Sequence, residues 1–563
     1  MKASLFSGFI LSIFSLTALA QQNFTSQQAY EKVREARERG INLWGKDNPT
    51  KSDLDHSITI LDSIIYYLDN EKTIDLAQGN ISLKGRKNDV YFDMLNVYML
   101  AHEYDKAMVV LDNYCGEGAY YNIPFFEKDS LFIPVRSDIR FQAAIKKLKL
   151  RRALWQDESL KSAYQSNLSE DQKVAGLSLL WSKAKYNFAN FDHASLDWDY
   201  TYLEFLPRVK NTNSTAQYYK VLEQFYAQLK DGHSNVYVPE ALVNEFYSRP
   251  PIRTELIEGR VFVTQVFSDS LKSTGVLPGT EIISIDDQSV LNYGKTQIAP
   301  YVSSSTPQDM DVRTYTYSLL AGPSNKSIQL QLRNSKGRTW KQAISRSGYH
   351  DIKNSSVGLQ YTQIGQIGYL TLNNFEEQTI MTQFDSLYIQ IAKTKGLIID
   401  IRYNGGGNNE IGYHILESLT NQPFETSYYK IPRYLPESNG IQWNENTSSK
   451  WPVNSKKQYD KPVVVLISAR TFSAAEDFTV AFDFMKRGKL IGQATGGSTG
   501  QPLNFSLPGG GFARICTRHD TYPNGKEFIG IGIIPDIVVK KTIKDLRSGT
   551  DMAKEIALQL LNK

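Results

Sequence analysis

The spacing of apolar residues predicts a helical first part of the chain followed by a mixed second part. Between residues 26 and 150, apolar positions recur every three or four residues, as in Ile58–Ile65, which is typical of amphipathic helices. The same spacing returns between residues 171 and 240 and ends at the turn residues Asp231 and Gly232. Alternating apolar residues follow, so we expect His233 at a helix-to-strand junction, where a side chain can face a cleft.

Further along, the pattern changes twice. Short strands are expected within residues 252–346, including 260–266 and 281–285. Beyond Gly358, strands and helices alternate, and the strands at 396–402 and 462–468 are apolar throughout. Continuous apolar strands between helices indicate a sheet covered on both faces. The predicted fold class is therefore multidomain α+β, with these segments: 1–20, 21–160 (helical), 165–250 (a helical cap), 252–346 (a β domain), 358–545 (an α/β domain) and 546–563 (a C-terminal helix).

Composition narrows the functional classes. The chain has 563 residues, of which 41% are hydrophobic and 22% charged, so it is globular rather than disordered. A net charge of +4 is near neutral for this length and argues against a nucleic-acid-binding protein. Two cysteines, Cys115 and Cys516, are too few for a disulfide framework or a thiolate zinc site, and we expect both to be buried free thiols.

The N-terminus predicts export. Lys2 precedes an apolar run at residues 5–19, and small residues stand at Ala18 and Ala20. This is the pattern of a secretory signal peptide cleaved after Ala20, and the run is shorter than the roughly 20 residues that span a bilayer. We therefore expect an exported protein, periplasmic or secreted, without a stable membrane anchor.

Ser473 is the candidate nucleophile. It follows the apolar strand 462–468 and a short turn, and it opens a predicted helix at Ala474. Backbone N–H groups in the first turn of such a helix are free to stabilise an oxyanion beside the hydroxyl. Ser473 with Glu476 also fits a capping box, in which both side chains only satisfy the helix end, so the segment alone leaves both interpretations open.

A glycine-rich loop elsewhere in the same predicted domain favours the interpretation of Ser473 as a nucleophile. Gly405, Gly406 and Gly407 also follow an apolar strand and precede a helix, and glycines allow a substrate carbonyl or an anion to approach the backbone. The loop lacks the Gly-Lys-Ser/Thr ending of a P-loop and the GxGxxG spacing of a dinucleotide fold. A tight turn is the other interpretation, although it rarely needs three successive glycines.

These segments resemble known families. GLIIDIRYNGGGNN, VVVLISARTFSAAEDF, LIGQATGGSTG and GIGIIPDIVV occur in this order and resemble the C-terminal processing (tail-specific) serine peptidase family. GVLPGTEIISIDDQSV within 252–346 resembles a PDZ domain, which binds an extended chain at a sheet edge. Residues 21–160 resemble a degenerate tetratricopeptide-like hairpin, with a plain helical domain as the equal alternative. The resemblance implies a crotonase/ClpP-like α/β catalytic domain.

The resemblance also implies site residues. Ser473 matches the nucleophile, and His233 within LKDGHS (229–234) matches the histidine base of the tricorn-like branch. The loop TGGST, at 495–499, lacks the lysine of the Ser–Lys branch. Glu527 is the candidate for the third, orienting group, and Asp231 is the alternative.

The expected oxyanion hole combines the backbone N–H of Ala474 with that of Gly405 or Gly406.

The sequence therefore predicts an exported serine endopeptidase acting on polypeptides without a metal or another cofactor. No His-Glu-x-x-His spacing supports a metallohydrolase. Two alternatives remain: an inactive relative that binds peptides or apolar ligands, and a scaffold that recruits partners through its helical and PDZ-like regions.

Overall fold

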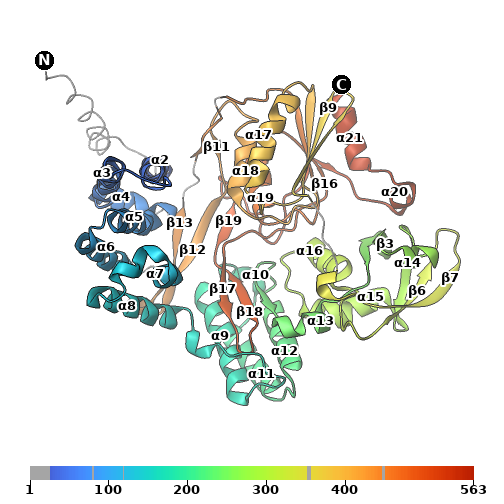
Figure 1. Ribbon diagram of the computed structural model, residues 1–563. Coiled ribbons are helices and arrows are strands. Elements are labelled where there is room, and N and C mark those ends of the chain that lie inside the picture. The colour runs from blue at the N-terminus through green and yellow to red at the C-terminus, as the bar shows by residue number, and fades with distance from the viewer. Residues whose placement is uncertain are drawn as a thin grey trace. The chain divides into compact units, whose positions relative to one another are not determined.

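The structure is a computed structural model in which the chain forms two compact units, Met1–Ser159 and Leu160–Lys563 (Figure 1). The predicted signal peptide at 1–20 lies outside the described residues. The structure describes residues 26–78, 81–117, 120–351, 357–446, 450–454 and 456–562.

The described residues of the first unit form helices joined by short turns, as the apolar spacing predicts. Its side chains form one core, in which rings such as Tyr114, Phe126 and Phe132 are fully buried. The α3 helix begins with a capping box between Thr50 and Asp53. The helices are α2 (Ser26–Trp44), α3 (Lys51–Leu68), α4 (Glu71–Gln78), α5 (Ile81–Leu100), α6 (Tyr104–Gly116), α7 (Ile123–Lys128) and α8 (Ile139–Trp155).

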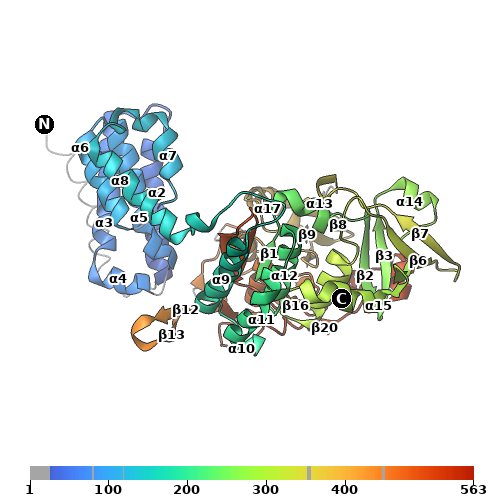
Figure 2. The ribbon, with the colours of Figure 1, turned by 90° about the horizontal axis from the view of Figure 1, so that it is seen from below.

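The second unit begins with a small helical layer that carries His233. Figure 2 shows α9 (Glu170–Asn187), α11 (Trp198–Lys210) and α12 (Thr215–Ala227) together. Trp198 stacks on Phe225 with ring centroids 4.3 Å apart in their shared core. After α12 the chain enters the short strand β1 (Asn235–Tyr237), so His233 does lie at a helix-to-strand junction.

An antiparallel sheet follows, in the order β2-β3-β4-β6-β7, with β2 at one edge. Its expected strands are present, but residues 290–318 also form short helical segments that the sequence pattern did not predict, including α16 (Pro307–Asp311). The strands are β2 (Ile252–Ile257), β3 (Arg260–Val266), β4 (Glu281–Ile285), β6 (Ile328–Arg333) and β7 (Thr339–Ile344).

A six-stranded sheet with helices packed on it forms the largest core of the second unit. Its order is β20-β16-β15-β10-β9-β8, with every pairing parallel except β8 with β9. The strands are β8 (Leu359–Ile364), β9 (Ile367–Leu372), β10 (Gly396–Asp400), β15 (Val463–Ile467), β16 (Gly488–Gly492) and β20 (Ile537–Val538). The helices are α17 (Thr379–Ile391), α18 (Asn409–Leu416), α19 (Ala474–Phe484) and α21 (Met552–Leu561).

The register of this sheet determines where the site forms. The neighbouring strands β10 and β15 are fully buried and pair with Asp400 opposite Leu466. Parallel strands present their carboxyl ends at the same edge, so the glycine loop after β10 and the Ser473 turn after β15 emerge side by side. The Phe472 N–H donates to the Asn404 carbonyl over 3.0 Å and ties the two loops together.

Three further sheets were not predicted from the sequence, and one of them is the two-stranded pair of β11 (Phe424–Glu425) and β14 (Lys450–Trp451). β12 (Tyr428–Leu435) and β13 (Gly440–Asn446) form a hairpin whose other neighbour is β19 (His519–Thr521). β18 (Phe512–Cys516) pairs with β17 (Pro502–Ser506) on one side and with β1 on the other, which joins the His233 segment to the C-terminal part of the chain.

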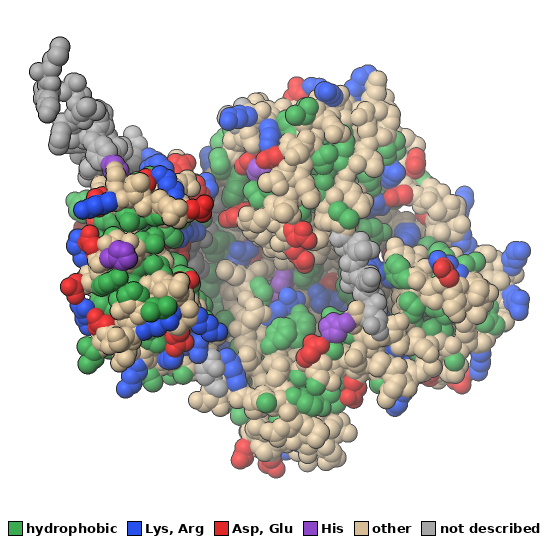
Figure 3. All heavy atoms as spheres, in the orientation of Figure 1, with side chains coloured by type: hydrophobic (Ala, Val, Ile, Leu, Met, Phe, Trp, Pro, Cys, Tyr) green, Lys and Arg blue, Asp and Glu red, His purple; other side chains and the backbone are tan. Residues whose placement is uncertain are grey.

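The distribution of surface charges and the state of the two cysteines agree with what the composition predicts. Lysine and arginine side chains are interspersed with aspartate and glutamate on the face that Figure 3 shows. Cys115 and Cys516 are buried free thiols, as expected. Within the described residues, no helix is both long enough and apolar enough to cross a bilayer.

Candidate active site

Ser473 lies at a strained turn directly before α19. Its backbone angles of φ 57° and ψ −130° are ones that residues with a side chain rarely adopt, and such strain is concentrated at functional sites. The Ser473 hydroxyl makes no capping bond to the helix, so the capping-box interpretation is wrong. The side chain is directed instead to His233, with Oγ 3.0 Å from Nε2.

His233 is brought to Ser473 from 240 residues away in the sequence. Only 3% of its surface is exposed, and its ring stacks on Phe472 with centroids 4.7 Å apart. Burial holds the pKa of His233 well below its ordinary value, and three nearby arginines lower it further: Arg514, Arg313 and Arg518. The imidazole is therefore neutral at neutral pH, which is the form that can accept a proton from a hydroxyl.

A serine that the sequence analysis did not single out contacts the other ring nitrogen. Ser498 Oγ lies 2.8 Å from His233 Nδ1. If Nε2 is to accept the proton of Ser473, Nδ1 must carry the ring proton and donate it to Ser498. The Ser498 carbonyl also accepts the Ser473 N–H over 3.1 Å, so one residue contacts both members of the pair.

Glu476 fixes the loop that carries Ser498. Its fully buried carboxylate accepts Thr495 Oγ1 at 2.5 Å, the Gly497 N–H at 2.8 Å and the Ser498 N–H at 2.9 Å. Burial raises the pKa of Glu476 to about 8, against the effect of these three donors. Glu476 thus acts on the loop behind the histidine and does not cap its own helix.

The structure does not bring Glu527 to His233, which corrects the expected third residue. Glu527 is 47% exposed, and its carboxylate pairs with His519 Nε2 at 3.0 Å. His519 Nδ1 lies 2.7 Å from Asn190 Oδ1, and Asn190 Nδ2 donates to Asp231 over 3.3 Å. This chain of side chains connects Glu527 to the His233 turn without a direct contact between Glu527 and the imidazole among the described residues.

Asp231, the alternative orienting group, acts on the backbone. Its Oδ1 accepts the His233 N–H at 2.9 Å and Ser234 Oγ at 2.8 Å, so it shapes the turn and does not contact the imidazole. Gly232 completes this turn, because a Cβ built there would lie 2.7 Å from the Phe472 ring that supports His233.

The expected oxyanion donors divide into two kinds. The N–H groups of Ala474 and Gly405 have no acceptor in the part of the chain that the structure describes. Ala474 directly follows Ser473, and Gly405 directly precedes Gly406, which packs against Ser473. The Gly406 N–H instead donates to Asn404 Oδ1 over 2.9 Å, so Gly406 is not a free donor. Gly406 has another function: with φ of +100°, it packs so closely that a Cβ there would lie 2.6 Å from Ser473 Cβ.

Residues 303–313, which belong to the part of the chain that forms the antiparallel sheet, contact both the His233 turn and the loop that carries Ser498. Ser303 Oγ accepts the Asp231 N–H over 3.1 Å, and Ser305 Oγ accepts the Gly232 N–H over 2.9 Å. Thr306 Oγ1 donates to the Gly496 carbonyl over 2.9 Å. The His233 turn and the Ser498 loop therefore share one support.

Among the described residues, no group of His, Cys, Asp or Glu side chains is arranged to hold a metal ion.

Comparisons with known proteins identify the matching region. Residues 366–539 match the model of peptidase family S41, a range that contains Ser473 and Ser498 but not His233. A carboxyl-terminal-processing protease of Synechocystis sp. is 25% identical over 262 residues, which cover 44% of this chain and 58% of that protein. The tricorn protease of Thermoplasma acidophilum is 26% identical over 226 residues, which cover 40% of this chain and 18% of that protein.

The aligned parts span about half the length of the first curated relatives, 58%, 43% and 46% of them. Among solved structures, mature CPAF complexed with lactacystin aligns with a TM-score of 0.57 at 16% identity, covering 70% of this chain and 99% of that one. This likeness shows a shared fold.

Proposed function

We propose that the protein is a serine endopeptidase that hydrolyses polypeptides through an acyl-enzyme on Ser473. The match of residues 366–539 to peptidase family S41, a family of serine peptidases, supports the proposal. The observation that carries the proposal is the 3.0 Å contact between Ser473 Oγ and His233 Nε2. A hydroxyl within hydrogen-bond reach of a neutral imidazole is the arrangement that activates a serine.

In the proposed reaction, Ser473 Oγ attacks the carbonyl carbon of a peptide bond while His233 Nε2 takes the hydroxyl proton. The N–H groups of Ala474 and Gly405 stabilise the negative oxygen of the tetrahedral intermediate. His233 then gives its proton to the departing amine, which leaves an ester on Ser473. A water molecule, deprotonated by His233, hydrolyses the ester and restores the hydroxyl.

Ser498 takes the orienting role that the sequence analysis gave to Glu527. Its contact with Nδ1 selects the ring tautomer that leaves Nε2 free to accept a proton. Glu476 holds Ser498 through the bond from the Ser498 N–H. Both are proposed as positioning residues, because neither contacts the reacting hydroxyl.

Residues 252–346 are proposed to be a PDZ-like domain that presents substrate. Strand β2 lies at an edge of its sheet, where an extended peptide can add as a further strand. We also propose that the protein is exported after cleavage at Ala20. The N-terminal residue of the protein recovered from its native source tests the cleavage site.

Peptide hydrolysis tests the proposal. The full chain is expected to cleave unstructured polypeptides, and Ser473→Ala and His233→Gln are each expected to reduce the rate at least about 10³-fold. Hydrolysis that persists in Ser473→Ala would overturn the assignment. Peptide binding without hydrolysis in the unmodified protein would instead favour the inactive, ligand-binding alternative.

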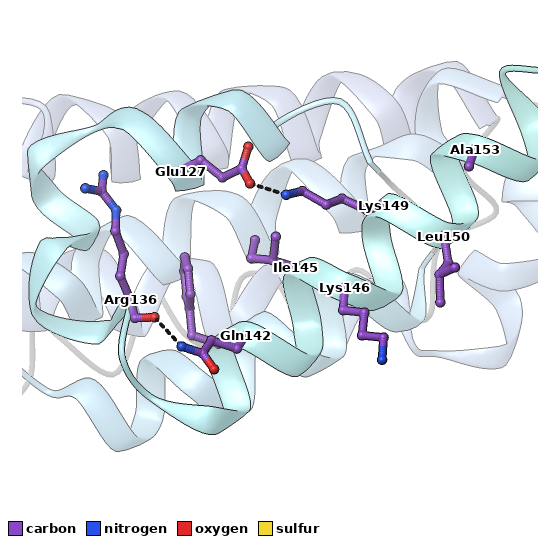
Figure 4. A pocket seen from close by; sticks show the side chains of 9 residues that line it. Glu127, Arg136, Gln142, Ile145, Lys146, Lys149, Leu150 and Ala153 are labelled. Carbon is purple, nitrogen blue, oxygen red and sulfur yellow. Dashed lines mark hydrogen bonds and ion pairs between the residues drawn. The ribbon is translucent and has the colours of Figure 1, made fainter. Parts of the chain in front are cut away.

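A groove on the first unit favours a second function, docking of a polypeptide. Its volume is about 770 Å³, and its polar rim has three cations and one acid, Glu127, which pairs with Lys149 at 2.5 Å (Figure 4). The apolar lining includes Phe141, Ile145 and Leu150. An acidic peptide with apolar side chains complements this surface.

The docking function is tested by charge reversal. In the groove, Lys146→Glu is expected to weaken binding of an acidic peptide to the full chain about tenfold. Lys84→Glu, on α5 of the same unit, is the matched control and should leave the affinity unchanged. Equal affinities for the unmodified protein and both variants would contradict docking at this groove.

A further inference from the structure

A pocket lies beside the candidate active site, between the antiparallel sheet and the carboxyl edge of the six-stranded sheet. Its volume is about 580 Å³. One wall is the end of β2 with the β2–β3 turn, and the opposite wall is formed by the turns that follow β10 and β15. Residues that line it include Glu255, Leu256, Tyr403, Ser468, Arg470 and Lys541.

Arg470 occupies the catalytic side of this pocket, three residues before Ser473. Its guanidinium carbon lies 4.6 Å from the ring centroid of Tyr403 and 5.5 Å from that of Tyr317. Arg470 Nε donates to the Tyr317 hydroxyl over 3.2 Å. The guanidinium is thus held in place by two aromatic rings from two different domains.

The two terminal nitrogens of Arg470 contact no acceptor among the described residues. A neighbouring arginine in the same pocket shows the contrast: Arg402 is bonded to both Asp400 and Asp551. Each terminal nitrogen carries two N–H groups, so the oriented guanidinium offers four donors that no group of the described residues accepts.

The acids of the pocket do not take these donors. Glu255, the acid whose charge acts on the pKa of Arg470, forms an ion pair with Lys541 at 2.8 Å. Glu258 accepts the Ile543 N–H, and Asp545 caps the helix that begins at Ile543. The pKa of the remaining acid, Asp311, is raised by burial alone.

Two further arginines that do not line the pocket, Arg253 and Arg249, add positive charge near Arg470. Burial lowers the pKa of Arg253, and the charges of Arg470 and Arg249 lower it further. Like charges that repel one another in this way create a local preference for an anion. Arg253 belongs to β2, the edge strand at which we propose that substrate adds.

We propose that Arg470 is a specificity determinant that binds a carboxylate of the polypeptide substrate through its two terminal nitrogens. The inference rests on the proposed peptidase function and names the class of substrate that this site prefers. Paired N–H donors in one plane match a carboxylate, which accepts them with both oxygens.

The short sequence distance between Arg470 and Ser473 limits how far the bound carboxylate lies from the cleaved bond. Three residues span at most about 11 Å, and an extended substrate advances about 3.3 Å per residue. The carboxylate should therefore lie within about four residues of the bond that is cleaved. It is either the substrate's C-terminus or the side chain of an aspartate or glutamate.

Two sets of peptides separate these sources. In the first set, one neutral sequence with an amidated C-terminus carries Glu or Gln at each position within four residues of the cleaved bond. In the second set, the same sequence ends one to four residues after that bond as a free acid or as an amide. The expected result is a ratio of kcat/KM, acid over amide, of about tenfold or more at one position in one of the two sets.

Substitution of Arg470 tests whether this residue causes the preference for the acid over the amide. Arg470→Gln should bring that ratio to within about twofold of one, and Arg470→Lys, which keeps the charge without the paired donors, should retain part of it. The control Arg338→Gln, in the β6–β7 turn of the antiparallel sheet, should leave the ratio unchanged. The ratio compares two substrates on one variant, so a general loss of activity does not move it.

Binding of the same peptides to the Ser473→Ala protein distinguishes the two proposals. Acid preference in binding that disappears in the Ser473→Ala, Arg470→Gln double variant supports the carboxylate site, even if no peptide is hydrolysed. Hydrolysis that depends on Ser473 but shows no acid preference at any position overturns the inference and leaves the proposed function standing. An acid preference that survives Arg470→Gln also overturns it.

Discussion

Replacement of Ser498 by alanine tests whether this residue orients the base. The variant removes the oxygen that lies 2.8 Å from His233 Nδ1 and leaves the reacting pair, Ser473 and His233, chemically intact. Because His233 is only 3% exposed, water does not readily replace the lost partner. The Nδ1–H group is then buried without an acceptor.

The expected loss follows from that unsatisfied donor. A buried polar group without a partner costs about 1–3 kcal/mol, and each 1.36 kcal/mol changes a rate tenfold. We therefore expect kcat/KM to fall about 5- to 150-fold in Ser498→Ala. The loss should appear in kcat more than in KM, because the orientation of the imidazole matters during proton transfer rather than during substrate binding.

The assay is steady-state hydrolysis of one peptide by the unmodified protein, Ser498→Ala and the control Ser506→Ala, with thermal unfolding recorded for each. Ser506 belongs to β17 of the same unit and makes no contact with the site residues described above. A kcat/KM for Ser498→Ala within twofold of the unmodified protein would refute the reasoning. Stacking on Phe472 would then be sufficient to position the imidazole.

Other predictions concern the glycine loop and two buried titratable groups. Gly406→Ala should reduce kcat about 10²-fold or more, because its Cβ would displace Ser473. The control Gly85→Ala, where a Cβ meets nothing within 4 Å, should leave kcat unchanged. Equal losses of kcat in the two variants would contradict this prediction. Glu476 binds its proton more tightly in the folded chain, with a pKa of about 8, than in the unfolded chain, so stability should fall as pH rises from about 4.5 through 8. Denaturant titrations of Glu476→Gln should lack this slope. The acid limb of kcat/KM should lie below pH 6.5, because His233 stays neutral; a limb at or above 6.5 would contradict its burial.

The proposed catalytic pair was predictable from the sequence because each member has a local signal. Ser473 follows an apolar strand and opens a helix, and His233 stands where a helical pattern changes to a strand. Strand pairing then supplies what the local patterns lack: β1 joins β18, and β15 joins β10. The resemblance of the motifs supplied the pairing of the two residues before any geometry was known.

The residues that position Ser473 and His233 were not predictable in the same way. The spacing of Ser473 and Glu476 fits a capping box, but the positive φ of Ser473 turns its hydroxyl away from the helix end and leaves Glu476 for the Ser498 loop. No local pattern marks Ser498, whose role depends on a contact across 265 residues. Glu527 failed as a prediction because His519, on the neighbouring strand β19, takes its carboxylate.

Covalent labelling with a fluorophosphonate identifies the activated serine. The reagent forms a stable ester with an activated serine, and peptide mapping by mass spectrometry locates the ester. We expect one modified residue, Ser473, no modification in Ser473→Ala, and labelling at least tenfold slower in His233→Gln. Labelling at another serine, or unchanged labelling in Ser473→Ala, would contradict it.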